Sequence, residues 1–197
     1  MDPSTPASGL AFTVGHSSCT AEELAALLQE NGVDTLVDVR RFPGSRRHPH
    51  FNRGRLEATL KAKGIGYRHS EALGGWRGEP LPDSPNTALN ASGFRSYADH
   101  LGVDAQARTA VEEALNEAAD RRLALMCAEA DPRRCHRLLL ADVLAVRGLE
   151  VRHILGPGRV EVHRPAPELR LLPDGRVVWV HDGARQEEIF SPEEGEE

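Results

Sequence analysis

Apolar residues along this chain fall into short runs separated by segments with helical spacing. The runs LAFTVGHS, DTLVDVR, IGYRH, RLALMCAE and EVRHIL begin at residues 10, 34, 65, 122 and 150. Their length and their aliphatic and β-branched content are typical of buried strands. The pattern therefore predicts five strands distributed along the chain.

Helices are predicted between these runs from caps and apolar spacing. Thr20 and Glu23 form a capping box for a helix that carries Leu24, Leu27 and Leu28 on one face. Further helices are expected from the cap Asn52 through Leu56 and Leu60, near 94–101, over 104–119, and from Asp131–Pro132 to Gly148.

Strands that alternate with helices indicate a mostly parallel sheet flanked by helices, which is an α/β fold. The segment LRLLPDGRVVWV, with its Pro-Asp-Gly turn, predicts a C-terminal β-hairpin. We expect a flexible N-terminus over 1–9, a single α/β core domain over 10–156, a hairpin extension over 157–183 and an acidic tail over 184–197.

Composition narrows the class of protein. The 197 residues, 40% of them hydrophobic, suffice for one packed core, and no apolar run approaches the 18 residues of a membrane span. The first residues lack the features of a signal peptide, and three irregularly spaced cysteines do not form a disulfide framework. We expect a cytoplasmic protein with reduced thiols and no membrane partner.

Charge is unevenly distributed, although the net charge is only −6. The window from Arg40 to Gly78 holds ten Lys or Arg residues against Glu57 and Glu71. This asymmetry indicates either an anionic partner, such as a nucleotide or nucleic acid, or a solvated basic surface balanced by acidic helices.

Polar residues follow several of the predicted strands. His16, Asp38 and the pair Cys127 and Glu129 each end a different strand. Because parallel strands direct their carboxyl ends to the same edge of a sheet, we expect these side chains to converge there with Arg40. His16, Asp38 and Glu129 are the acid/base candidates, although Asp38 and Arg40 also fit a structural ion pair.

The stretch LALMCAEADPRRCHR contains the candidate thiols. Cys135 is predicted in the first turn of a helix beside Arg134, His136 and Arg137, where the helix dipole and the cations favour a thiolate. Cys127 ends an apolar strand and fits a shielded hydrophobic position. The sequence thus allows a thiol enzyme in which Cys135 or Cys127 reacts and His136 assists.

A metal site is the second interpretation. Cys127, Cys135 and His136, with His16 or Asp38, are donors suited to zinc or iron. The spacing Cys-x7-Cys-His is not typical of zinc fingers or ribbons. If both Cys135 and His136 are helical, their side chains diverge by roughly 100° around the axis, which disfavours a shared ion.

A nucleic-acid or nucleotide binder is the third interpretation. The loop RRFPGSRRHPHFNRGR offers phosphate ligands in Arg40, Arg41, Ser45, Arg46 and Arg47, with Arg137 as a further candidate from the later helix. Phe42, Phe51, Tyr67 and Trp76, four of the nine aromatic residues, lie within or near this loop. They are suited to stacking on bases, and equally to anchoring a loop.

Five motifs carry a family resemblance: TVGHSSCTAEEL, LVDVRRFPGSRRHPHFN, GIGYRHSEALGGWR, GFRSYADHL and LALMCAEADPRRCHRLLLAD. Over about residues 12–155 they resemble domain-of-unknown-function family 488. The resemblance implies an α/β domain and a set of motif positions, without an established reaction. The sequence is best interpreted as an enzyme whose crevice, lined by Cys, His, Glu and Arg, acts on a phosphate-bearing ligand.

Overall fold

The computed structural model describes residues 9–44 and 48–181 of the chain. The strands are β1 (Leu10–Gly15), β2 (Thr35–Asp38), β3 (Gly66–His69), β4 (Leu123–Cys127), β5 (Glu150–Gly156), β6 (Arg159–Val162), β7 (Leu169–Leu171) and β8 (Val177–Trp179). The α-helices are α1 (Ala21–Glu30), α2 (Arg53–Ala62), α3 (Ser92–Val103), α4 (Ala105–Asp120) and α5 (Arg137–Val146). Short 3₁₀ helices are η1 (Pro49–Phe51), η2 (Glu71–Leu73) and η3 (Pro132–Arg134).

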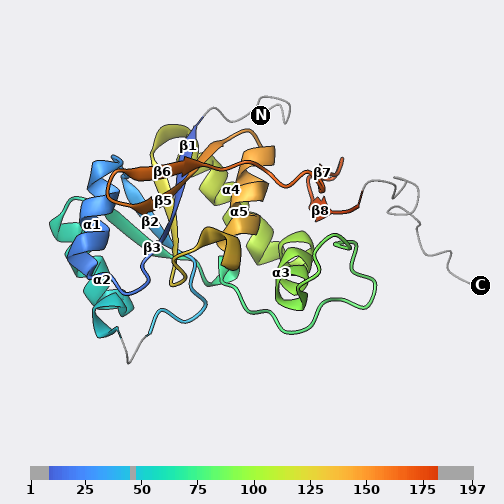
Figure 1. The fold of residues 1–197 in the computed structure, drawn as a ribbon, viewed down its shortest axis with the longest axis horizontal. Coiled ribbons are helices and arrows are strands. Elements are labelled where there is room, and N and C mark those ends of the chain that lie inside the picture. Colours follow the sequence, from blue (N-terminus) through green and yellow to red (C-terminus); the bar gives the residue numbers. More distant parts are fainter. Residues whose placement is uncertain (1–8, 45–47, 182–197) are drawn as a thin grey trace, which may run out of the picture.

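The described residues form a six-stranded sheet in the order β3-β2-β4-β1-β5-β6 (Figure 1). The first five strands in this order pair in parallel, and β6 joins the edge antiparallel to β5. The expected α/β fold with a mostly parallel sheet is therefore confirmed. Strand β6, which belongs to the segment 157–183, completes the main sheet.

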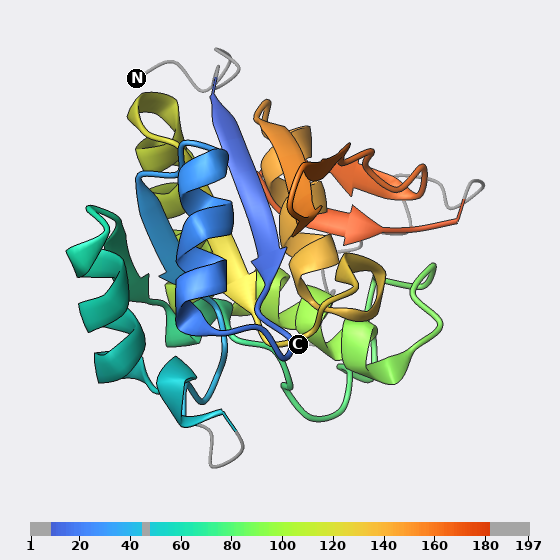
Figure 2. The same cartoon turned by 60° about the vertical axis from the view of Figure 1, so that its left-hand side comes forward.

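Helices cover both faces of the sheet, as Figure 2 shows. Helices α1 and α2 pack on one face with Phe12, Val14 and Met126, while α3, α4 and α5 pack on the other with Ala11 and Leu125. Alternate residues of β1 and β4 thus enter opposite cores, as a strand buried on both faces requires. Cys127 lies on the α4–α5 side.

Local signals set the helix ends. The Thr20 hydroxyl accepts from the backbone N–H of Glu23 at 3.1 Å, and the Glu23 carboxylate accepts from the Thr20 N–H at 2.7 Å. Asp104 caps α4 by accepting from Ala107 N–H. The predicted capping box is confirmed.

The predicted C-terminal hairpin is β7–β8, which turns at Pro173–Gly175. Its Trp179 is 1% exposed and donates its indole N–H to Asp142 on α5, so the hairpin is packed on the core rather than separate from it.

The helix expected from Asp131 to Gly148 is wrong in its first part. Pro132–Arg134 is a 3₁₀ turn, Cys135 is extended at φ −129° and ψ 144°, and α5 begins only at Arg137. Asp131 caps the short turn by accepting from Arg133 N–H, and Cys135 N–H bonds to the Pro132 carbonyl. The chain therefore changes direction at Cys135 before it enters α5.

No helix formed by the described residues combines the length and the apolar character that a transmembrane span needs.

Candidate functional site

The candidate residues gather where β1, β2 and β4 end. Gly15 is level with Cys127 in the sheet, and the next residue, His16, donates its backbone N–H to the Cys127 carbonyl at 3.0 Å. A Cβ on Gly15 would stand 2.0 Å from the Glu129 carbonyl oxygen, so only glycine permits this approach. The structure thus brings His16, Cys127 and Glu129 to one edge of the sheet.

Cys127, Cys135 and His136 form a compact cluster at this edge. Their two sulfurs and one imidazole nitrogen all lie within 4.8 Å of one another. His136 Nδ1 is 3.6 Å from Cys135 Sγ and 4.0 Å from Cys127 Sγ. We call these three residues the Cys–His cluster.

The extended backbone of Cys135 makes the cluster possible. The 100° divergence expected for two adjacent helical residues does not apply, because Cys135 precedes the helix. The dipole argument for Cys135 is wrong for the same reason, and Cys127, which was expected to be shielded, is the more exposed of the two thiols. Cys135 is 5% exposed, whereas Cys127 and His136 are half-buried.

The orientation of His136 is set by its second nitrogen. Nε2 lies 3.0 Å from the Val39 carbonyl oxygen, which can only accept a hydrogen bond, so Nε2 carries the proton. In the neutral ring Nδ1 then presents its lone pair to the two sulfurs. The Tyr97 ring packs edge-on against the imidazole at 4.9 Å between centroids.

Gly75 covers the same imidazole from the loop after η2. A Cβ at this position would lie 2.7 Å from His136 Nδ1. Sequence reasoning missed Gly75 and Tyr97, although the dipeptide Gly74–Gly75 before Trp76 was a visible signal of close backbone approach.

Arg137 is the charged neighbour of the cluster. Its side chain is 1% exposed, its Nε donates to Cys135 Sγ at 3.4 Å, and one terminal nitrogen donates to the Glu129 carbonyl. No carboxylate among the described residues pairs with it. Because a buried guanidinium needs a nearby anion, Cys135 is best described as a thiolate.

The two thiols have opposite pKa shifts. A hydrogen bond from the Cys127 thiol is the main cause that lowers the pKa of Cys135, against burial, and the charge of Arg137 acts in the same direction. The same hydrogen bond and burial raise the pKa of Cys127. These contacts therefore favour the thiolate form of Cys135 over that of Cys127.

Asp38 and Arg40 form a buried ion pair beside the cluster. Asp38 is fully buried and accepts from Arg40 Nε at 2.8 Å and from the Tyr67 hydroxyl at 2.8 Å. Burial and the Asp38 carboxylate raise the pKa of Tyr67. Arg40 also donates to the Phe51 carbonyl, so this pair holds η1 near the end of β2.

His16 is stacked on Phe51 and is 3% exposed. Burial, aided by the nearby charge of Arg40, lowers its pKa to about 4. Its Nδ1–H donates to the Ser17 carbonyl and its Nε2 faces Arg40 at 3.5 Å. His16 is consequently neutral near pH 7.

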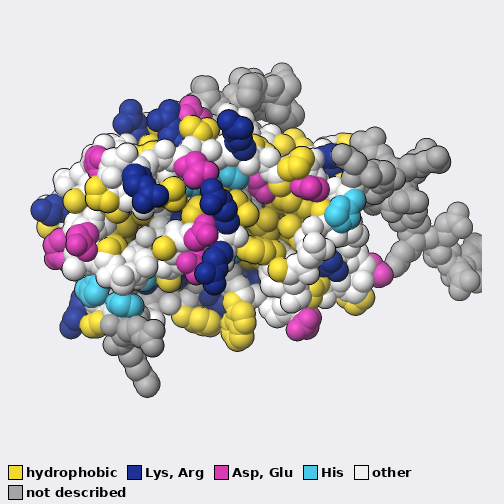
Figure 3. Space-filling view, in the orientation of Figure 1, with side chains coloured by type: hydrophobic (Ala, Val, Ile, Leu, Met, Phe, Trp, Pro, Cys, Tyr) yellow, Lys and Arg dark blue, Asp and Glu magenta, His cyan; other side chains and the backbone are white. Residues whose placement is uncertain are grey.

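The arginines expected to bind an anion have different environments. Arg40 and Arg137 are buried in the contacts described above, and Arg41 lies against Phe42 and Trp76. Ser45, Arg46 and Arg47 lie outside the described residues. On the face seen in Figure 3, basic and acidic side chains are interspersed.

A buried polar chain that sequence reasoning missed lies on the α5 side of β1. Thr13 contacts His153 Nδ1 at 2.7 Å, His153 Nε2 contacts His163 Nδ1 at 3.0 Å, and His163 Nε2 contacts Asp142 at 2.9 Å. The strand pattern concealed it, because His153 lies within the apolar run EVRHIL and its partner His163 follows a different strand, β6. These hydrogen bonds hold His163, in the C-terminal segment, against Asp142 on α5.

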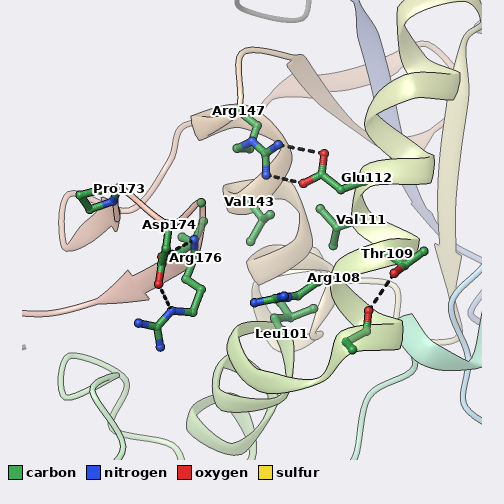
Figure 4. A pocket seen from close by; sticks show the side chains of 13 residues that line it. Leu101, Arg108, Thr109, Val111, Glu112, Val143, Arg147, Pro173, Asp174 and Arg176 are labelled. Atoms are coloured by element: carbon green, nitrogen blue, oxygen red, sulfur yellow. Dashed lines mark hydrogen bonds and ion pairs between the residues drawn. The ribbon is translucent and has the colours of Figure 1, made fainter. Parts of the chain in front are cut away.

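A cavity of about 510 Å³ lies elsewhere, between α4, α5 and the β7–β8 turn (Figure 4). Arg147 pairs with Glu112 on one side of it, and Arg176 pairs with Asp174 on the other. None of the candidate site residues lines it, so its size does not make it the reaction site.

Comparison with protein families gives one match. The model of "Domain of unknown function DUF488" aligns with residues 20–144, well over half of the chain. The chain belongs to this family. No curated protein and no solved structure matches it.

The DUF488 match contains the whole Cys–His cluster, together with Asp38, Arg40 and Gly75. His16 and the His153–His163 chain lie outside the matched span. The site centred on Cys127, Cys135 and His136 is therefore part of the DUF488 region, whereas the two histidines of the buried polar chain, His153 and His163, follow that region.

Proposed function

We propose that this DUF488 protein is a metal-dependent enzyme whose centre is a zinc ion bound by Cys127, Cys135 and His136. Two sulfurs and one imidazole are the soft and borderline donors that zinc prefers. The observation that carries the proposal is the spacing of these donor atoms.

Tetrahedral zinc has bonds of about 2.3 Å to sulfur and about 2.0 Å to nitrogen, which separates a sulfur and a nitrogen ligand by about 3.6 Å. Nδ1 of His136 lies 3.6 Å from Cys135 Sγ and 4.0 Å from Cys127 Sγ. Small movements would therefore bring all three donors onto one ion.

The surroundings of the cluster support the same proposal. Imidazole ligands of metals generally donate their second N–H to a carbonyl or carboxylate, as His136 does to Val39. Arg137 donates to Cys135 Sγ, which would stabilise a metal-bound thiolate.

Three protein ligands leave a fourth position for water or substrate, as in catalytic zinc sites. Zinc bound there would supply Lewis-acid chemistry and a water of lowered pKa. Cys127 and His136 are half-buried, so the cluster is accessible through these two residues. A hydrolytic reaction on a phosphate-bearing substrate is the activity we propose.

Metal analysis of the purified protein tests this proposal. We expect about one zinc per chain by elemental mass spectrometry, and loss of zinc in Cys127→Ser, Cys135→Ser and His136→Ala. Cys19→Ser is the matched control, because Cys19 is a free thiol outside the cluster. Absence of zinc and iron from the parent protein, or equal loss in Cys19→Ser, would contradict the proposal.

A second candidate function is thiol catalysis, which the Arg137–Cys135 contact favours. Here Cys135 acts as the nucleophile and the Cys127 thiol is its proton donor. Site-resolved alkylation distinguishes the two functions. Thiol catalysis predicts that Cys135 is modified before Cys127 in protein that never contained metal, whereas metal binding predicts that a chelator accelerates labelling of both together.

A further inference from the structure

We propose that Phe42, Arg41 and Trp76 form a base-stacking surface that binds single-stranded nucleic acid next to the Cys–His cluster. Phe42 is 65% exposed and Trp76 is 78% exposed. The guanidinium carbon of Arg41 lies 5.4 Å from the Phe42 ring centroid and 5.6 Å from that of Trp76. Two exposed rings from distant segments thus share one cation. We call these three residues the Arg41 surface.

The Trp76 backbone is held in an unfavourable conformation. Its φ of +61° lies in the left-handed region, which tryptophan rarely adopts. Arg41 donates to the Trp76 carbonyl, and a Cβ on Gly74 would stand 2.7 Å from the Arg41 Cα. The loop is therefore fastened against Arg41.

The exposed Trp76 ring contributes little to folding, because most of its surface remains in water. A strained backbone that presents a large apolar ring to solvent is instead the arrangement expected of a recognition residue. The same conclusion applies to Phe42, which shares the cation with it.

The chemistry of this surface fits a nucleic-acid strand. Flat aromatic rings stack on bases of any sequence, and arginine adds a cation for the base face or the phosphate. Arg41 supplies a positive charge between the two rings, which favours an anionic partner over an apolar peptide. A single strand fits better than a duplex, since only unpaired bases present free faces to exposed rings.

The Arg41 surface lies next to the Cys–His cluster. Gly75 separates Trp76 from the cluster, and a Cβ on Gly75 would lie 2.7 Å from His136 Nδ1. A strand stacked on Trp76 would thus pass next to the proposed metal ligand. That a nucleic-acid strand is the substrate rests on the proposed function, whereas binding of the strand to the Arg41 surface does not.

Tryptophan fluorescence provides the test, because the two tryptophans differ sharply. Trp76 is exposed and Trp179 is 1% exposed. A single-stranded oligothymidylate of about twelve nucleotides should quench the long-wavelength emission of Trp76 and leave that of Trp179 unchanged. Anisotropy of the same labelled oligonucleotide measures the affinity, with a duplex of equal length and heparin as comparison ligands.

Trp76→Gly suits the positive φ and removes the ring, so this variant should fold and bind at least about fivefold more weakly. Phe42→Ala should show a similar loss, and Trp76→Phe should retain most of the affinity. Leu171→Ala, at a 45% exposed apolar residue on β7, is the matched control and should bind as the parent does.

Unchanged affinity in Trp76→Gly, or equal binding of duplex or heparin, would overturn the inference, since charge alone would then explain the binding. Each titration is repeated on chelator-treated protein. Quenching that persists without metal supports the Arg41 surface whatever the metal content. Retained zinc without any quenching contradicts this inference and leaves the proposed function standing.

Discussion

His136 donates its Nε2–H to the Val39 carbonyl at 3.0 Å and thereby directs Nδ1 toward the sulfur of Cys135. The bond connects the segment between β4 and α5 to the residue that follows β2. Strands β2 and β4 are neighbours in the sheet. Val39 is fully buried and its own N–H bonds to the Met126 carbonyl, so its carbonyl is a rigid acceptor. The imidazole is therefore aligned by the fold itself, before any ligand binds.

Gly75→Ala should disturb this alignment. The added Cβ would meet His136 Nδ1 at 2.7 Å, so either the loop or the ring must move. We expect zinc affinity to fall by about tenfold or more while the fold persists, as measured by competition with a chromogenic chelator. Gly102→Ala, in α3 with nothing within 4 Å of the new Cβ, is the control. Equal affinities in the two variants would show that Gly75 has no positioning role.

Arg137→Gln should destabilise the protein. Removing a buried guanidinium leaves the Cys135 thiolate and the Glu129 carbonyl without their donor, and breaking a buried charge pair costs about 3 kcal/mol. Urea unfolding of metal-free protein measures the free energy. Arg133→Gln, at an arginine that is 69% exposed and pairs with Glu161, should change it by less than about 0.5 kcal/mol. A comparable small loss in Arg137→Gln would mean that Cys135 carries no charge.

Stability should decrease in mild acid because of His153. Burial, with the charges of His163 and Arg137, lowers its pKa to about 4. As pH falls, the unfolded chain binds this proton first, near pH 6.5, so stability is full above that value and is lost down to about pH 4. The loss from this group is about 3 kcal/mol.

Urea titrations at several pH values measure this loss. In His153→Gln the dependence between pH 6.5 and 4 should be shallower by a similar amount, even though the variant is less stable at pH 7. An unchanged slope would assign the acid sensitivity to other groups, such as His16, whose pKa is also lowered by burial.

The local pattern of residues was sufficient to predict much of this protein. Apolar runs marked β1 to β5, and Thr20 with Glu23 marked the start of α1, because periodicity and capping depend on neighbours in sequence. The carboxyl-end rule also indicated where His16, Asp38 and Cys127 would lie, since it needs only parallel strands and not their order.

The tertiary structure alone decided which of these residues meet. Cys135 leaves the helical conformation because Pro132–Arg134 closes a 3₁₀ turn, and this change turns a sequence spacing that disfavoured a metal site into the Cys–His cluster. Likewise Gly75 approaches His136, and His153 bonds to His163, through the strand order and loop packing. Such contacts join residues far apart in the chain, so no local pattern encodes them, and only the folded backbone determines their geometry.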